Sequence, residues 1–144
     1  MKKLLALALL LSVAFTACDS ADPEIVSGRE WNSAKQVVAD TTSSFAPSDP
    51  FIVQFNYGKA FDFDSLKIEF LDEAGKTRFR QTVEVQHRTG SYTVVGKKKG
   101  QVMTAENYFR SKKAQDVTVK FTALVSNKDA TLEKLSLEKK LQIR

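Results

Sequence analysis

The sequence predicts an all-β protein, an antiparallel β-sandwich of about seven or eight strands that follows an N-terminal export signal. From residue 51 to the C-terminus, apolar and polar residues alternate with a period of two, which is typical of strands buried on one face. Short turn sequences separate these alternating runs. Only one long and nearly continuous apolar run occurs, at residues 4–15, and it precedes the predicted domain.

Residues 1–17 have the order of a bacterial secretory signal. Two lysines open the segment, the apolar residues 4–15 follow, and small residues then precede Cys18. A helix of this apolar length would be about 18 Å long, whereas a membrane core is about 30 Å thick. We therefore expect residues 1–17 to form a signal helix that is cleaved and not a membrane span.

The segment Phe15-Thr16-Ala17-Cys18 resembles the lipobox of bacterial lipoproteins. This resemblance implies that Cys18 is diacylated on sulfur, becomes the new N-terminus and holds the protein on the inner or outer membrane of the cell envelope. Cys18 is the only cysteine, so no internal disulfide can form. Two or three acyl chains give a stable anchor, at about 0.8 kcal/mol per buried methylene. Cleavage of an ordinary signal after Cys18 is the alternative.

The charge of the chain is divided unevenly between its two halves. Removal of residues 1–17 from the 144-residue chain leaves 127 residues, enough for one domain. Residues 19–75 carry four basic and eleven acidic side chains, a net charge of −7, and residues 76–144 carry sixteen and six, a net charge of +10. We favour solvated faces of neighbouring strands as the explanation, because the basic residues alternate with apolar ones. A basic surface for an anionic partner is the alternative.

The N-terminal part of the mature chain predicts little regular structure. Residues 18–33 are expected to form the lipidated N-terminus and a flexible tether, because they are rich in Asp, Ser, Ala and Pro and contain Gly28. Trp31 is the one residue there with a reason to dock on the domain. The β-sandwich domain is expected to span residues 34–144, with a first strand at 35–39.

Alternating runs define the strands from residue 51 to residue 95. Gly75 can supply the positive φ of a hairpin loop at residues 72–76, and residues 88–91 form another turn. The residues expected to face the core are Phe51, Val53, Phe55, Tyr57, Leu66, Ile68, Phe70, Phe79, Val83 and Val85.

The C-terminal part contains the clearest alternation. Residues 104–114 are expected to form a short helix or an irregular excursion. Residues 117–125 alternate strictly, 127–130 form a turn, and the parity of 135–143 predicts a final strand although some helical spacing is present.

Together these elements are typical of an immunoglobulin-like sandwich, without the cysteine–tryptophan–cysteine core of antibody domains. Two segments also resemble small immunoglobulin-like domains of bacterial envelope lipoproteins. They are Phe45-Ala46-Pro47-Ser48-Asp49, which precedes the first core strand, and Asp72-Glu73-Ala74-Gly75, which follows the next one. The resemblance implies this fold and no particular activity.

Lys97, Lys98 and Lys99 are the main candidates for ligand binding. They lie between Gly96 and Gly100, and three ammonium groups could bind an anionic glycan or lipid. Near an anionic surface each is worth about 1 kcal/mol. A solvated hairpin tip is the simpler interpretation of the same residues.

Two other polar groups are weaker candidates. His87 is the only histidine, so a zinc or catalytic role has no second histidine and no free thiol to support it. Asp62 and Asp64 have the alternate spacing of a calcium loop, but a turn capped by their side chains is the simpler interpretation. We expect no metal and no cofactor.

The sequence favours a non-catalytic protein. No glycine-rich phosphate loop, nucleophile elbow or HExxH helix is present. The first hypothesis is a membrane-anchored protein-interaction or structural module with an envelope protein partner, contacted through sheet edges. The second is a module that binds an anionic glycan or lipid through Lys97, Lys98 and Lys99, and an enzyme is a third. Nucleic acid is not expected, because no aromatic stacking motif surrounds the lysines.

Overall fold

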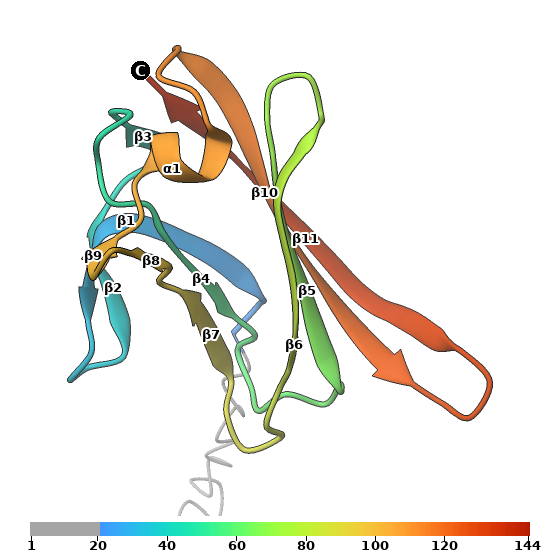
Figure 1. Ribbon diagram of the computed structural model, residues 1–144. Coiled ribbons are helices and arrows are strands. Elements are labelled where there is room, and N and C mark those ends of the chain that lie inside the picture. The colour runs from blue at the N-terminus through green and yellow to red at the C-terminus, as the bar shows by residue number, and fades with distance from the viewer. Residues whose placement is uncertain (1–20) are drawn as a thin grey trace, which may run out of the picture.

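The computed structural model describes residues 21–144, so the predicted export signal and Cys18 lie outside the described residues. Within residues 21–144, eleven strands and one short helix form two facing sheets and a small hairpin, as Figure 1 shows. The predicted all-β sandwich is confirmed. Eight strands have four or more residues, as expected, and three strands of two residues were not predicted.

The first sheet has four antiparallel strands in the order β2-β1-β4-β7. These strands are β1 (Glu24–Asn32), β2 (Val37–Thr41), β4 (Ile52–Asn56) and β7 (Ser91–Val94).

The second sheet has five strands in the order β3-β11-β10-β5-β6. They are β3 (Ser44–Phe45), β5 (Ser65–Leu71), β6 (Thr77–Glu84), β10 (Gln115–Ser126) and β11 (Thr131–Ile143). All pairs are antiparallel except β3 with β11. Strands β4 and β7 lie in one sheet and β5, β10 and β11 in the other, which is the crossing pattern of immunoglobulin-like sandwiches.

Two small elements lie between β7 and β10. β8 (Lys97–Lys98) and β9 (Gln101–Val102) form a hairpin, and α1 (Ala105–Phe109) follows it, within the stretch 104–114 that was expected to be a short helix or an irregular excursion. Thr104 caps α1, because its hydroxyl accepts the backbone N–H of Asn107 while the Asn107 side chain accepts that of Thr104. No helix in residues 21–144 has the length and hydropathy to cross a membrane.

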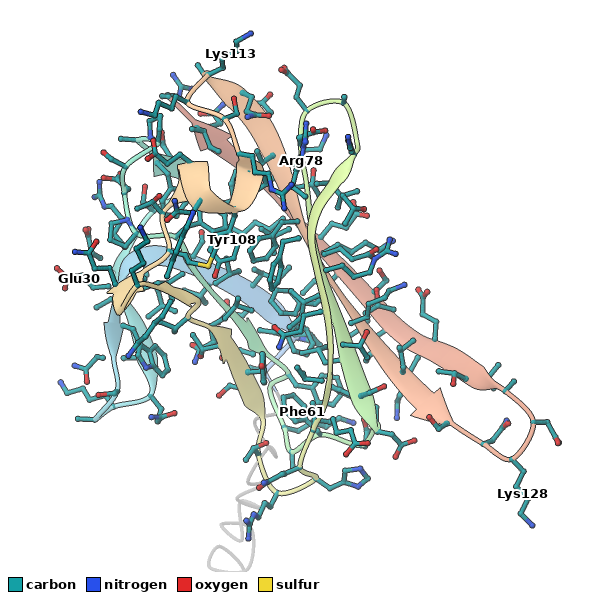
Figure 2. All side chains as sticks on the ribbon, in the orientation of Figure 1. Glu30, Phe61, Arg78, Tyr108, Lys113 and Lys128 are labelled. Carbon is teal, nitrogen blue, oxygen red and sulfur yellow. The ribbon has the colours of Figure 1, made fainter. Side chains whose placement is uncertain are left out.

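Aromatic side chains fill the space between the sheets. Phe55 of β4 and Phe121 of β10 stack across the sandwich with ring centroids 5.4 Å apart. Figure 2 shows Phe61 at the lower end of this core and Tyr108 of α1 at the upper end. The predicted inward faces of β4, β5 and β10 are confirmed. Their buried apolar residues include Val53, Phe55, Leu66, Ile68, Phe70, Val117, Val119, Phe121 and Ala123.

The predicted tether is wrong for residues 24–32, which form β1. Ile25 lies opposite Phe55 and is buried, and Ser27 lies opposite Val53 and is also buried. The inward positions of β1 therefore include a serine, so the strand lacks the hydrophobic alternation by which the others were predicted. The domain begins at β1 and not at residue 34, and the strand predicted at 35–39 is the second one, β2.

Candidate binding groove

The β1–β2 ribbon bends over the outer face of the first sheet. Gly28 permits the bend, because a Cβ at this position would lie 2.6 Å from the carbonyl oxygen of Ala39 and 2.6 Å from Val38 Cγ1. The bend covers the outward-facing side chain of Ile52, which is only 1% exposed although it points away from the core. An outer layer of chain is thus added to one end of the sandwich.

Gln54 ties this ribbon to the sheet beneath it. Its side-chain amide donates to the carbonyl oxygen of Gln36, in the β1–β2 connection, at 3.0 Å and to the hydroxyl of Thr93 on β7 at 2.9 Å. Gln54 is buried, so both bonds are shielded from water. They fix the ribbon relative to β4 and β7.

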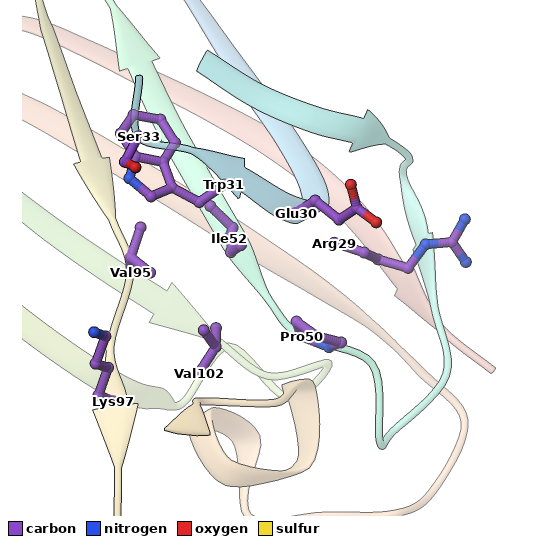
Figure 3. Close-up of a pocket in the computed structure, with 9 residues that line it drawn as sticks. All are labelled: Arg29, Glu30, Trp31, Ser33, Pro50, Ile52, Val95, Lys97 and Val102. Atoms are coloured by element: carbon purple, nitrogen blue, oxygen red, sulfur yellow. The ribbon is translucent and has the colours of Figure 1, made fainter. Parts of the chain in front are cut away.

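A groove of about 630 Å³ separates the bent ribbon from the β8–β9 hairpin. Figure 3 shows Trp31 and Glu30 along one side, Val95, Lys97 and Val102 along the other, and Ile52 with Pro50 between them. Lys97 was predicted from the sequence as a ligand-binding residue, and Trp31 was expected to dock on the domain. The groove was not predicted, because it depends on the bend at Gly28.

The base of the β8–β9 hairpin is firmly attached to the core. Gly96 donates its N–H to the Tyr108 hydroxyl at 3.0 Å, and the Met103 N–H donates to the Gly96 carbonyl at 2.8 Å. Phe51 in turn donates its N–H to the Met103 carbonyl at 3.0 Å. Gly96 is therefore a packed junction and not a hinge, because any Cβ there would collide with the Tyr108 hydroxyl.

The hairpin orients its lysines differently. Lys97 pairs with Val102 and both line the groove, whereas Lys98 is the next residue along β8 and does not line it. Lys99 and Gly100 occupy the tip with φ values of 50° and 80°. All three lysines are exposed, so the predicted hairpin tip is present and one of its lysines belongs to a groove.

The two sides of the groove differ in charge. Within residues 21–144, no carboxylate lies within 4.0 Å of the ammonium groups of Lys97, Lys98 and Lys99. On the opposite side, Arg29 donates to Asp40 at 2.8 Å, and this hydrogen bond raises the pKa of Arg29. The hairpin side is therefore positive. On the β1 side, the carboxylate of Asp40 on β2 offsets most of the charge of Arg29 on β1.

Asp62 and Asp64 connect the loop before β5 to neighbouring segments through hydrogen bonds and ion pairs. Asp62 accepts the Tyr57 hydroxyl at 2.6 Å and forms ion pairs with Lys134 at 2.9 Å and Lys59 at 3.2 Å. Asp64 accepts the backbone N–H of Ser126 at 2.7 Å. Among residues 21–144 no group of three or more His, Cys, Asp or Glu side chains is arranged to hold a metal ion.

His87 lies beside Asp64 at the end of the sandwich where β6 ends. Its Nε2 is 3.6 Å from Asp64 Oδ1, and Ser65 and Ser126 line the same open pocket. In the described part of the chain, no hydrogen bond joins His87 to either serine hydroxyl. The pocket therefore has the residue types of a nucleophile, a base and an acid without the contacts that would connect them.

The edge of the second sheet offers a different kind of contact. β11 pairs with β3 only through Gln142 and Ile143, so within residues 21–144 no strand covers the outer edge of β11 from Thr131 to Leu141. A β-bulge interrupts β11 between Glu133 and Leu135. Beyond the bulge, the side chain of Lys139 turns inward and donates to the Ile25 carbonyl at 3.1 Å, and burial lowers the pKa of Lys139.

Lys97 is thus the only one of the predicted site residues that the structure places in a groove, and Cys18 lies outside the described residues. No protein-family model matches the chain, and no curated protein sequence matches it.

Proposed function

We propose that this chain is a lipid-anchored protein of the bacterial envelope whose β-domain is a non-catalytic interaction module. The anchor is the acylated Cys18, on the inner or outer membrane. The observation that carries the interaction proposal is the long open edge of β11. An extended segment of a partner protein adds to such an edge through backbone hydrogen bonds.

The features of β11 restrict which segment can add. The bulge leaves seven regular residues, 135–141, before β3 covers the edge. Strands of about five or six residues are common, so this length suffices. Inward-turned lysines protect natural edge strands from indiscriminate pairing. A partner strand that covers Lys139 therefore needs an acidic group opposite it.

Photo-crosslinking in cells tests the protein partner. A photoreactive residue in place of Ser136, which is exposed on β11, is expected to give one adduct of fixed size that maps to an extended segment of the partner. The matched control is the same residue in place of Lys113, which Figure 2 shows at the far end of the molecule. Equal adducts from both positions, or none from Ser136, would remove the edge as the contact.

The anchor has its own test. Replacement of Cys18 by Ser is expected to abolish labelling with radioactive palmitate and to leave the chain unprocessed, because the lipobox thiol is the acylated atom. The β-domain is expected to remain folded, because residues 24–143 form its two sheets and the aromatic core between them. A variant that is still labelled and processed would show that Cys18 is not the anchor.

A second candidate function is the binding of an anionic glycan or lipid. The specific observation in its favour is the position of Lys97, which lines a groove together with Trp31 and has no carboxylate partner within residues 21–144. In this function the domain recognises a ligand on its outer sheet face and not along a strand edge.

A further inference from the structure

The groove between β1 and the β8–β9 hairpin has the size and the lining of a ligand site. Its volume of about 630 Å³ lies within the range of about 300–1,000 Å³ found for small-molecule sites. Trp31, Val95 and Val102 supply apolar surface above the nearly buried Ile52, which is the usual kind of lining of such sites.

The polar groups of the groove are separated by type. Lys97 supplies a positive charge on the hairpin side, while Glu30 and Ser33 supply a carboxylate and a hydroxyl on the β1 side. Arg29 also lines the β1 side, but its guanidinium is paired with Asp40 at 2.8 Å. A ligand that fits both sides carries an acid at one end and neutral hydrogen-bond donors at the other. The same ligand needs an apolar face for the indole ring of Trp31.

We infer that this groove binds a saccharide that carries a carboxylate. The carboxylate lies against the ammonium of Lys97, and the C–H face of a sugar ring lies against Trp31. Sugar hydroxyls donate to Glu30. The inference deepens the second candidate function and rests on it.

Two other occupants fit the same residues less well. An acidic peptide places carboxylates along its whole length, so one of them would meet Glu30 across the groove. A lipid surface is flat, whereas Trp31 and Ile52 lie in a groove, and Ile52 is only 1% exposed. The lysine pair at the hairpin tip, Lys98 and Lys99, adds general attraction for anions without selecting among them.

The groove is organised before any ligand binds. The bonds from Gln54 hold the β1 side, and the contacts of Gly96 with Tyr108 hold the hairpin side. Little ordering is therefore required of the protein on binding, which favours affinity.

Trp31 provides the test, because it is the only tryptophan in the chain and its emission reports directly on the groove. The full chain is reconstituted in phosphatidylcholine vesicles and titrated with lactobionic acid, a disaccharide acid with its single carboxylate at one end and a galactose ring at the other. A saturable change in Trp31 emission is expected. Lactitol, the same disaccharide with an alcohol in place of the carboxylate, is expected to bind at least about tenfold more weakly, since a charge-assisted hydrogen bond is worth about 1.5–3 kcal/mol.

Adjacent lysines give a matched pair of variants. Lys97→Ser is expected to weaken the binding of lactobionic acid by about tenfold, because it removes the ammonium that lines the groove. Lys98→Ser removes the same charge one residue along the strand and is expected to weaken binding by less than about threefold. Trp31→Leu removes the stacking surface as well as the reporter, so its weaker binding is measured by titration calorimetry.

The remaining outcomes overturn the inference. Equal losses in Lys97→Ser and Lys98→Ser would show that only overall charge matters. A saturable change with octaglutamate, or with phosphatidylglycerol vesicles alone, would assign the groove to an acidic peptide or to a lipid surface. No change in Trp31 emission with up to millimolar lactobionic acid would overturn the inference that the groove binds a saccharide carboxylate. The Ser136 adduct does not involve the groove, so these failures and that of the protein-partner function are distinguishable.

Discussion

At the scale of single residues, the pair formed by Tyr57 and Asp62 links the stability of the sandwich to pH. Burial, followed by the bond to Asp62, raises the pKa of Tyr57 to about 12. The same bond is the main cause that holds the pKa of Asp62 well below its usual range, with a further contribution from Lys134. The pair therefore stabilises the fold fully between about pH 4 and pH 10, and loses this effect outside that window as each group titrates.

Tyr57→Phe is expected to lower the free energy of unfolding by about 1 kcal/mol at pH 7, the typical worth of one hydrogen bond. Because Asp62 then regains a more ordinary pKa, the difference from the wild type is expected to narrow as the pH falls from about 4 toward 2. Urea unfolding at a series of pH values measures both effects. Tyr92→Phe, in the neighbouring β7, is the control, and identical pH profiles for wild type and Tyr57→Phe would contradict the role of the pair.

Thr122 is a residue whose replacement should stabilise the protein. It lies on β10 with 1% of its surface exposed, and its hydroxyl has no hydrogen-bond partner within residues 21–144. Thr122→Val keeps the shape and removes a buried unsatisfied hydroxyl, so a gain of about 1 kcal/mol in urea unfolding is expected. Thr118→Val, on the same face of β10 but more exposed, is expected to change stability by less than about 0.5 kcal/mol. A loss of stability in Thr122→Val would mean that the hydroxyl has a partner.

At the scale of elements, strands could be predicted from the sequence where apolar side chains share one face of the strand and polar side chains the other. Residues 51–57 and 117–123 alternate because one face of each strand is packed in the core, and both were predicted. β1 was missed because Ser27 and Gly28 occupy positions where other strands carry large apolar residues. The groove could not be predicted, because it arises from the bend of one ribbon over a strand far away in the sequence, which no local pattern records.

The tip of the β8–β9 hairpin carries a local strain that a substitution can relieve. Lys99 and Gly100 both have positive φ, as two-residue turns of type I′ require, and asparagine is preferred over lysine at the first position. A side chain other than glycine or asparagine in this conformation costs about 1 kcal/mol. Lys99→Asn is therefore expected to raise the free energy of unfolding by about 0.5–1 kcal/mol, with a higher Tm. Lys98→Asn, where φ is not positive, is the control and should give no gain.

At the scale of the whole molecule, ion pairs between the two halves of the chain offset part of their uneven charge. Ion pairs join the acidic half to the basic half at Asp72 with Arg78, Glu69 with Arg80 and Asp62 with Lys134, at 2.7–2.9 Å. The interpretation of neighbouring strands with solvated faces is consistent with these pairs. Lys97, Lys98 and Lys99 form no such ion pair within residues 21–144, so their charges remain available for an anionic ligand.

The position of the groove relative to the membrane follows from the register of the first sheet. If Cys18 is the anchor, the six residues from there to Glu24 span at most about 20 Å. Glu24 lies opposite Asn56, and Asn56 lies opposite Ser91, so the loop before Ser91 is at the anchored end. The hairpin follows the other end of β7, beyond Val94. The groove should therefore face away from the membrane that holds the protein.

Energy transfer to labelled lipids can measure this orientation. If Cys18, the only cysteine, is acylated as proposed, His87→Cys or Lys99→Cys introduces a single reactive thiol, at the anchored end and at the hairpin tip respectively. With a donor on that thiol and acceptor dyes on the lipid headgroups of reconstituted vesicles, transfer from position 87 is expected to be clearly more efficient than from position 99. The steep distance dependence of transfer makes a difference of a strand length easy to resolve, since four strand residues rise about 13 Å. Equal transfer would mean that the domain lies flat on the membrane, and stronger transfer from position 99 would place the lysine hairpin against the lipid, with a headgroup as its ligand.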